Sequence, residues 1–257
     1  MKEIILTKLS EIEAKEKVVI LYTCESGSRA WGFPSNNSDY DIRFLYVRPY
    51  DWYLSIDQKR DVLEYKLEGD LDVNGWDLCK ALGLFQKSNP PLFEWLNSPI
   101  KYFEKYSTAE KMRQLMPVYY SPIACAHHYL HMAQGNYREY LNGEQVWLKK
   151  YFYVLRPLLA IKWIESGFGP IPTEFGILVN RIIEDFKLKA EIEQLVNLKH
   201  QGNELAKGPR VKMISDFIDN ELSRLESIGI NFDSKSNPIE PLNDIFRDTL
   251  KEVWQSI

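Results

Sequence analysis

The hydrophobic pattern of the first third of the chain predicts both helices and strands. Apolar positions recur at near-helical spacing among lysines and glutamates in residues 1–17, which predicts an amphipathic helix. The run VVILYTCESG is continuous, apolar and rich in β-branched residues, and it predicts a buried strand that ends in a turn. YDIRFLYVRP predicts a second strand, with Asp41, Arg43, Leu45 and Val47 on one face. GSRAWGFPSNNSD, between the two strands, predicts one helical turn and then a loop.

The pattern changes from strands to helices further along the chain. DVLEYKLEGDLDVNGWDL predicts a hairpin with Glu-Gly-Asp at its turn, and LCKALGLFQKSN predicts a helix that Asn-Pro-Pro ends. Long helical periods then dominate, and they predict helices over 108–134, 145–166, 173–198, 210–228 and 241–255. The shift predicts two domains, residues 1–107 and residues 108–257, in an α+β protein.

Composition limits the classes of function. The 257 residues carry a net charge of -4, which argues against coating nucleic acid by overall charge but leaves room for a local basic groove. The three cysteines lie far apart without metal-ligand spacing, so we expect reduced thiols. No apolar run reaches the ~18 residues of a membrane span. These features predict a cytoplasmic protein without a membrane partner.

Two carboxylates suggest the chemistry. Asp39 and Asp41 are two residues apart at the start of a predicted strand, so they project to one face and can bind a hard cation such as Mg²⁺. Gly27 and Ser28 lie at a predicted helix start, where backbone N–H groups favour phosphate. Asp-x-Asp alone is weak, because surface strands and Ca²⁺ loops also contain it. Together the two motifs indicate metal-dependent phosphoryl or nucleotidyl transfer.

Such a site normally has a third carboxylate on another strand. Asp77 is the preferred candidate, because it ends the predicted return strand immediately before a helix. Asp72 is the alternative, and Asp70 is expected to belong to the turn.

Longer stretches of the sequence resemble a known family. ESGSRAWGFPSNNSDYDIRFLYV is similar to the signature of the DNA polymerase β superfamily of nucleotidyltransferases. That run, NGWDLCKALGLFQKSNPPLFEWLNSPIKY and KKYFYVLRPLLAIKWIE together resemble the branch of predicted nucleotidyltransferases associated with bacterial RNA repair. These matches are spread over residues 20–165, and the last third of the chain is less distinctive.

The resemblance implies a polymerase β-like catalytic domain with a mixed sheet, followed by an all-helical domain that completes the cleft for nucleotide and acceptor. It implies two Mg²⁺ ions, with Mn²⁺ as a substitute. It also implies transfer of a nucleoside monophosphate from a nucleoside triphosphate, with ATP among the candidates, to a hydroxyl such as an RNA end.

Carried over by position, the resemblance assigns roles to the two motifs. Gly27 and Ser28 would hold phosphates, and Asp39 and Asp41 would ligate metal. Asp77 is expected as the third metal ligand and catalytic carboxylate from its place at a strand end.

Two arginines flank the expected site. Arg29 directly follows the Gly-Ser pair, a position that favours contact with phosphate. Arg43 shares the strand face of Asp41. It can contact a triphosphate or pair with a carboxylate, and the sequence leaves both roles open.

A second group of candidates lies in the helical half. On a helix, Lys149, Tyr153 and Arg156 would share one polar face, which predicts either nucleotide contact or a solvated stripe. The resemblance favours contact, with Lys149 or Lys150 and Arg156 on phosphates and Tyr153 on the base or ribose. Pro157 would kink or break this helix.

Other features carry less weight. His127 and His131 have the spacing of a metal pair but lack the glutamate of the metalloprotease motif, so packing or surface exposure is the preferred interpretation. Trp31 lies in the loop, where a base can stack on it. The competing functions are modification of a protein or a small molecule by the same chemistry, and binding of a triphosphate without turnover. The sequence does not predict the oligomeric state.

Overall fold

The computed structural model describes residues 1–66, 70–201, 206–230 and 237–254, without the side chain of Lys66. Contacts divide the chain into two compact units. Unit 1 consists of Met1–Ala30, Asp39–Tyr120 and Ser236–Ile257, and unit 2 of Trp31–Ser38 and Ser121–Lys235.

Unit 1 is built on a five-stranded mixed sheet. The strand order is β3-β4-β2-β1-β5, in which β2 and β4 are parallel and the other pairs are antiparallel. The strands span Val62–Lys66 (β3), Leu71–Asp77 (β4), Tyr40–Val47 (β2), Val19–Glu25 (β1) and Lys101–Glu104 (β5). The predicted α+β class is confirmed. The expected Glu-Gly-Asp turn falls largely on residues outside the described ranges.

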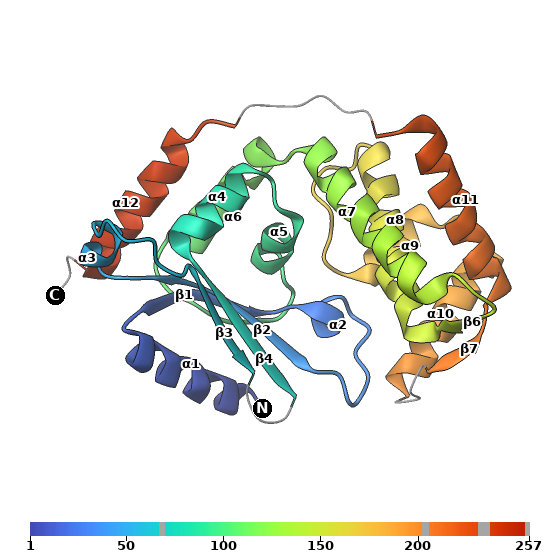
Figure 1. Cartoon of the computed structure of the whole chain (residues 1–257), viewed down its shortest axis with the longest axis horizontal. Coiled ribbons are helices and arrows are strands. Elements are labelled where there is room, and N and C mark those ends of the chain that lie inside the picture. Colours follow the sequence, from blue (N-terminus) through green and yellow to red (C-terminus); the bar gives the residue numbers. More distant parts are fainter. Residues whose placement is uncertain (67–69, 202–205, 231–236, 255–257) are drawn as a thin grey trace. The chain divides into compact units, whose positions relative to one another are not determined.

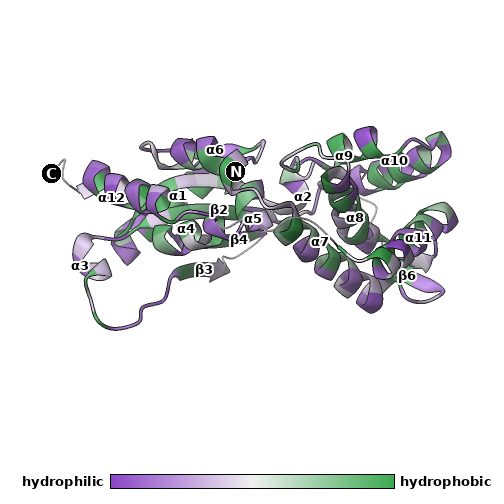
Figure 2. Ribbon diagram, turned by 90° about the horizontal axis from the view of Figure 1, so that it is seen from above, coloured by the Kyte–Doolittle hydropathy of each residue, from purple (hydrophilic) through white to green (hydrophobic). Residues whose placement is uncertain are grey.

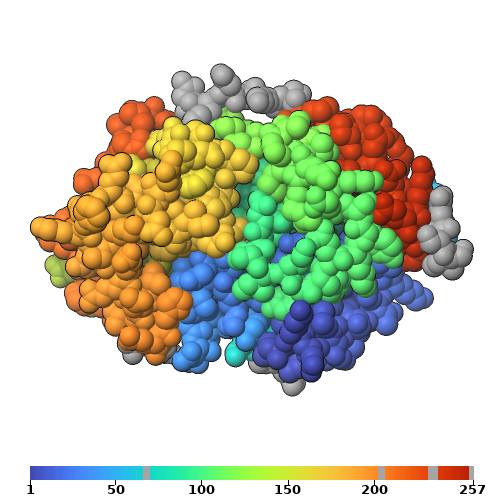
Figure 3. Space-filling model, turned by 180° about the vertical axis from the view of Figure 1, so that it is seen from behind, coloured from blue at the N-terminus to red at the C-terminus, as the bar shows by residue number. Residues whose placement is uncertain are grey.

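The two faces of the sheet are covered by different helices (Figure 1). Ile42, Phe44 and Tyr46 of β2 pack with α1 (Lys2–Glu16), which is dark blue and lies on the surface in Figure 3. Leu45 and Val47 point to the other face. That face is packed by α4 (Leu78–Gln86), α5 (Pro90–Leu96), α6 (Thr108–Tyr119) and α12 (Glu240–Trp254). The alternation predicted for this strand is therefore confirmed. Two short helices, α2 (Gly27–Ala30) and α3 (Tyr50–Tyr53), complete the unit.

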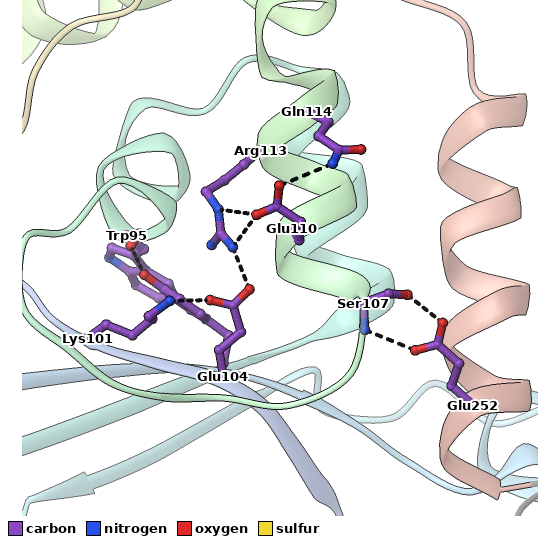
Figure 4. Close-up of polar contacts among 9 residues, drawn as sticks. Trp95, Lys101, Glu104, Ser107, Glu110, Arg113, Gln114 and Glu252 are labelled. Atoms are coloured by element: carbon purple, nitrogen blue, oxygen red, sulfur yellow. Dashed lines mark hydrogen bonds and ion pairs between the residues drawn. The ribbon is translucent and has the colours of Figure 1, made fainter.

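Helices α6 and α12 belong to unit 1, so the compact units do not coincide with a division at residue 107. Polar contacts hold these helices in place (Figure 4). The Glu252 carboxylate of α12 accepts hydrogen bonds from the Ser107 hydroxyl and, at 3.0 Å, from the Ser107 N–H. Lys111 of α6 lies 2.9 Å from Asp248 of α12. The C-terminal helix thus completes the core of the sheet unit.

Unit 2 is mainly helical within its described residues. Its helices are α7 (Pro122–Asn136), α8 (Tyr151–Glu165), α9 (Phe175–Ile182), α10 (Phe186–His200) and α11 (Lys212–Ile228). A short antiparallel pair, β6 (Gln145–Trp147) and β7 (Lys207–Pro209), accompanies them, with a π-helical turn η1 (Tyr137–Leu141) and a 3-10 turn η2 (Leu148–Lys150). In Figure 2, green and purple alternate along α11, as expected for a helix with one buried face. None of the described helices is long and apolar enough to cross a bilayer.

Several predicted helices are shorter in the structure. The helix expected over 108–134 is divided, because Ser121 caps a new helix at Pro122. The helix expected from residue 145 begins at Tyr151, because residues 145–147 pair with β7. α8 continues through Pro157, so no break occurs there. Two polar stretches between predicted helices, HQGNELAKGPR (200–210) and GINFDSKSNPIEP (229–241), fall partly outside the described ranges.

The connection between α2 and β2, residues 31–38, is anchored in unit 2. Phe33 is fully buried and stacks on Phe152 with ring centroids 4.6 Å apart. The carbonyl of Trp31 accepts a 2.9 Å hydrogen bond from the Phe175 N–H. The loop that separates the Gly-Ser and Asp-x-Asp motifs is therefore part of the helical core.

Candidate active site

Gly27 and Asp41 come into direct contact at the end of β1 and the start of β2. The Ser26 N–H donates a 2.8 Å hydrogen bond to the Asp41 carbonyl. Gly27 has a φ of +58°, and a Cβ at this position would lie 1.9 Å from Asp41 Oδ2. Only glycine accommodates both this backbone conformation and the neighbouring carboxylate. The two sequence motifs therefore form one site.

Glu25 supports this arrangement and was not singled out from the sequence. It is 1% exposed, accepts a 2.7 Å hydrogen bond from the Asp41 N–H, and accepts another from the Tyr102 hydroxyl. Burial raises the pKa of Glu25, and the bonds from Tyr102 and Asp41 partly oppose that shift. The feature of the sequence that could have identified Glu25 is its position, as an acidic residue at the end of an apolar strand immediately before Ser-Gly.

Arg43 connects two carboxylates on neighbouring strands. Its guanidinium lies 3.0 Å from Asp41 Oδ1 and 2.9 Å from Asp72 Oδ2. Asp41 and Asp72 are direct partners in the parallel register of β2 and β4, which is why they share a face. The structure shows the carboxylate pairing that the sequence left open for Arg43, and its contact with a triphosphate stays a prediction.

Asp39 is exposed and directly precedes β2. Burial is the largest cause of a raised pKa for Asp41, Arg43 lowers it, and the charges of Asp72 and Asp39 raise it further. We call Asp39, Asp41 and Asp72 the aspartate group. Arg43 bridges two of its three carboxylates, those of Asp41 and Asp72.

Asp77 does not belong to the aspartate group, contrary to the expectation. The register pairs it with Tyr46, five residues along β4 from Asp72, which corresponds to roughly 16 Å of strand. Its carboxylate is 3% exposed, accepts a 2.8 Å hydrogen bond from the Cys79 N–H and caps α4. The Tyr53 hydroxyl donates a second 2.8 Å bond to it. Asp77 is therefore a helix cap, and the alternative, Asp72, lies opposite Asp41.

The aspartate group fits a hard cation. It supplies carboxylate oxygens, and a bound cation would oppose both burial and the smaller repulsion from Asp72 and Asp39, which together raise the pKa of Asp41. Within the described residues, no three His, Cys, Asp or Glu side chains are arranged to hold a metal by themselves. Mg²⁺ does not need such a cage, because it binds through one or two carboxylates together with water and substrate phosphates. His127 and His131 are both exposed on α7, as the preferred interpretation expected.

The remaining predicted residues of unit 1 border the aspartate group. Arg29 lies over the Tyr40 ring at 3.8 Å from its centroid and donates a 3.1 Å hydrogen bond to the Tyr40 hydroxyl. Ser28 is buried in α2, with 8% exposure. Gly27, Ser28 and Arg29 thus occupy one turn beside Asp41.

The predicted residues of unit 2 separate into two kinds. Arg156 is fully buried, donates to the Thr173 carbonyl and lies 4.6 Å from the Trp31 ring centroid, so its predicted role on a phosphate does not match its position. Lys149 is exposed and Lys150 half-buried. The Lys150 ammonium lies 4.8 Å from the ring centroid of Tyr153.

Comparison with known proteins identifies the family. A model of the RNA repair pathway DNA polymerase beta family (RlaP) matches residues 1–248. The uncharacterized protein YcgL of Bacillus subtilis (strain 168) is 45% identical over 256 residues, which cover 99% of this chain and 98% of that protein. The crystal structure of a nucleotidyltransferase-like protein from Exiguobacterium sibiricum 255-15 matches 98% of this chain and 80% of its own, with 12% identity and a TM-score of 0.33. On the family match and the B. subtilis relative, the chain belongs to the RNA repair pathway DNA polymerase beta family.

Proposed function

We propose that this protein is a Mg²⁺-dependent nucleotidyltransferase that transfers a nucleoside monophosphate from a nucleoside triphosphate to a hydroxyl, with an RNA end as the acceptor. Family membership supports the reaction class. The observation that carries the assignment to a site is the contact between Gly27 and the Asp41 carboxylate, with Asp72 alongside on the next strand.

In the proposed reaction, the acceptor oxygen forms a bond to the α-phosphorus, the bond from that phosphorus to the pyrophosphate oxygen breaks, and the hydroxyl proton is released. Mg²⁺ held by Asp39 and Asp41, with Asp72, would neutralise charge on the phosphates and on the leaving pyrophosphate. The turn at Gly27 and Ser28 offers backbone N–H groups to phosphate oxygens.

Other side chains keep the aspartate group in position. Glu25 fixes the backbone of Asp41 through the 2.7 Å bond from its N–H. Arg43 holds Asp41 and Asp72 together and offsets their repulsion. Arg29, which follows the phosphate turn and lies over the ring of Tyr40, would contact the triphosphate.

The test compares Asp41→Asn with Asp57→Asn, which removes an exposed carboxylate of the same unit. Each protein is incubated with nucleoside triphosphates, Mg²⁺ and a pool of RNAs, and released pyrophosphate and labelled RNA are measured. Asp41→Asn should abolish transfer while its far-ultraviolet circular dichroism and melting temperature stay close to those of the wild type. Retained transfer would show that Asp41 is not the metal ligand. Binding of a triphosphate by the wild type without pyrophosphate release would favour a sensor instead.

A further inference from the structure

Four lysines of unit 2 form a group around aromatic rings. They come from η2, α10 and β7, segments that are far apart in the sequence. α10 lies in the orange part of the surface in Figure 3. We call Lys149, Lys150, Lys199 and Lys207 the lysine cluster.

The ammonium groups of the cluster lie over aromatic rings. Lys149 and Lys207 are 5.7 and 5.4 Å from the ring centroid of Trp147. The Lys150 ammonium is 4.0 Å from the ring centroid of Tyr140, and that of Lys199 is 4.5 Å from the ring centroid of Phe33. An aromatic ring attracts an ammonium group through the cation–π interaction, which does not use up the N–H donors of the ammonium. These donors can still form hydrogen bonds to an anion.

No carboxylate within the described ranges forms an ion pair with any lysine of the cluster. Glu139 acts on Lys150 only at longer range. The absence is notable because the protein as a whole is acidic, with a net charge of -4. A group of cations without an ion-pair partner among the described residues is suited to an external anion.

Lys199 is the clearest case. Its side chain is only 9% exposed, and burial together with the charge of Lys149 lowers its pKa to about 8. A phosphate near these two ammonium groups would offset the repulsion from Lys149, the smaller of the two causes.

The arrangement fits a strand better than a free nucleotide. Trp147 keeps 36% of its surface exposed between Lys149 and Lys207, so an unpaired base can stack on it. The four cations are spread over three elements, more than a single phosphate can contact. A nucleoside triphosphate also brings Mg²⁺, and the cluster contains no carboxylate to share that ion. Cations beside an exposed aromatic ring, as at Trp147, are typical of proteins that bind single-stranded nucleic acid.

We propose that the lysine cluster and Trp147 bind a single-stranded nucleic acid, with the ammonium groups on successive phosphates and the indole stacked on a base. This proposal depends on the proposed function in one respect, because the bound strand would be the acceptor of the nucleotidyl transfer. The binding itself is measured without nucleotide or metal, so the two proposals can fail separately.

The experiment measures fluorescence anisotropy of labelled 12-nucleotide oligo(U) and oligo(dT) with the full chain, in EDTA and phosphate-free buffer, at several KCl concentrations. For the wild type, log affinity should fall with log salt with a slope of about -3, since each phosphate contact of a single strand contributes about -0.7. The double variant Lys149→Gln/Lys207→Gln should reduce that slope by about 1.4. Trp147→Leu should weaken binding about 5- to 150-fold with little change of slope.

The matched control is Lys189→Gln/Lys212→Gln, which removes two lysines of the same unit outside the cluster, one of them paired with Asp216. It should bind like the wild type. The proposal is overturned if the wild type does not bind at low salt, or if the cluster variant keeps the wild-type slope. It is also overturned if the cluster variant loses affinity for a labelled nucleoside triphosphate and keeps affinity for the strand. Asp41→Asn should keep strand binding, and its loss of transfer reports on the proposed function alone.

Discussion

Replacement of Gly27 by alanine tests the contact on which the site assignment depends. The added methyl carbon would lie 1.9 Å from Asp41 Oδ2 and 2.8 Å from Asp41 Cγ. Since ordinary contact begins at 3.4 Å, the carboxylate must retreat by about 1.5 Å. The substitution therefore moves a proposed metal ligand without removing its charge.

The expected cost has two parts. A φ of +58° strains alanine by about 1–2 kcal/mol, which corresponds to a fall in melting temperature of roughly 2–8 °C. The displacement of Asp41 should act on catalysis, because a misplacement of about 1 Å can lower a rate about 100-fold. Gly27→Ala should thus lose at least about 100-fold in pyrophosphate release at saturating nucleotide.

Gly32→Ala is the matched control, because Gly32 has a φ of +87° and no atom within 4 Å of its Cβ position. It should show a comparable fall in melting temperature and keep most of its activity. Melting is followed by circular dichroism and activity by pyrophosphate release. If Gly27→Ala resembles Gly32→Ala in both measurements, the close contact between the two motifs has no catalytic importance and the site assignment is wrong.

The structure also predicts different consequences for the two carboxylates of β4 and for the buried lysine. Asp72→Asn should impair transfer strongly, whereas Asp77→Ala, which removes the oxygen that caps α4, should mainly destabilise the fold by about 1 kcal/mol. Equal losses of activity would contradict the register argument. Burial and the charge of Lys149 lower the pKa of Lys199 to about 8, from the ordinary lysine value of 10.5. Between these two pH values the unfolded chain binds more protons at this position than the folded chain does. The free energy of unfolding contributed by Lys199 therefore rises with pH across that window. The free energy of unfolding, measured with denaturant in phosphate-free buffer, should therefore differ between Lys199→Met and the wild type by an amount that changes with pH across the window. A difference that stays constant with pH would argue against the lowered pKa of Lys199.

Much of unit 1 could be predicted because its signals are local. The alternation in YDIRFLYVRP determines which side chains reach each face, and the structure places Ile42 and Phe44 with α1 and Leu45 with the opposite helices. The turn at Gly27 was likewise evident from small residues after an apolar strand. Such inferences need only the geometry of one strand or one turn.

The choice between Asp77 and Asp72 as the third carboxylate could not be made from the sequence, because it depends on the register between strands that are distant in sequence. Asp72 and Asp77 both lie on β4, and only the pairing of β4 with β2 decides which one faces Asp41. Arg156 illustrates a second limit. Helical spacing groups it with Lys149 and Tyr153, but it lies in the core beneath Trp31, because its long side chain satisfies a buried carbonyl.

The connection between the two motifs has a second role that the sequence did not indicate. As a spacer, residues 31–38 only needed enough length to return the chain to the start of β2. In the structure, Phe33 stacks in the core of unit 2 while Gly27 and Asp41, on either side of this segment, form the contact in unit 1. One connection therefore joins the two motifs of unit 1 and contributes a buried ring to the core of unit 2.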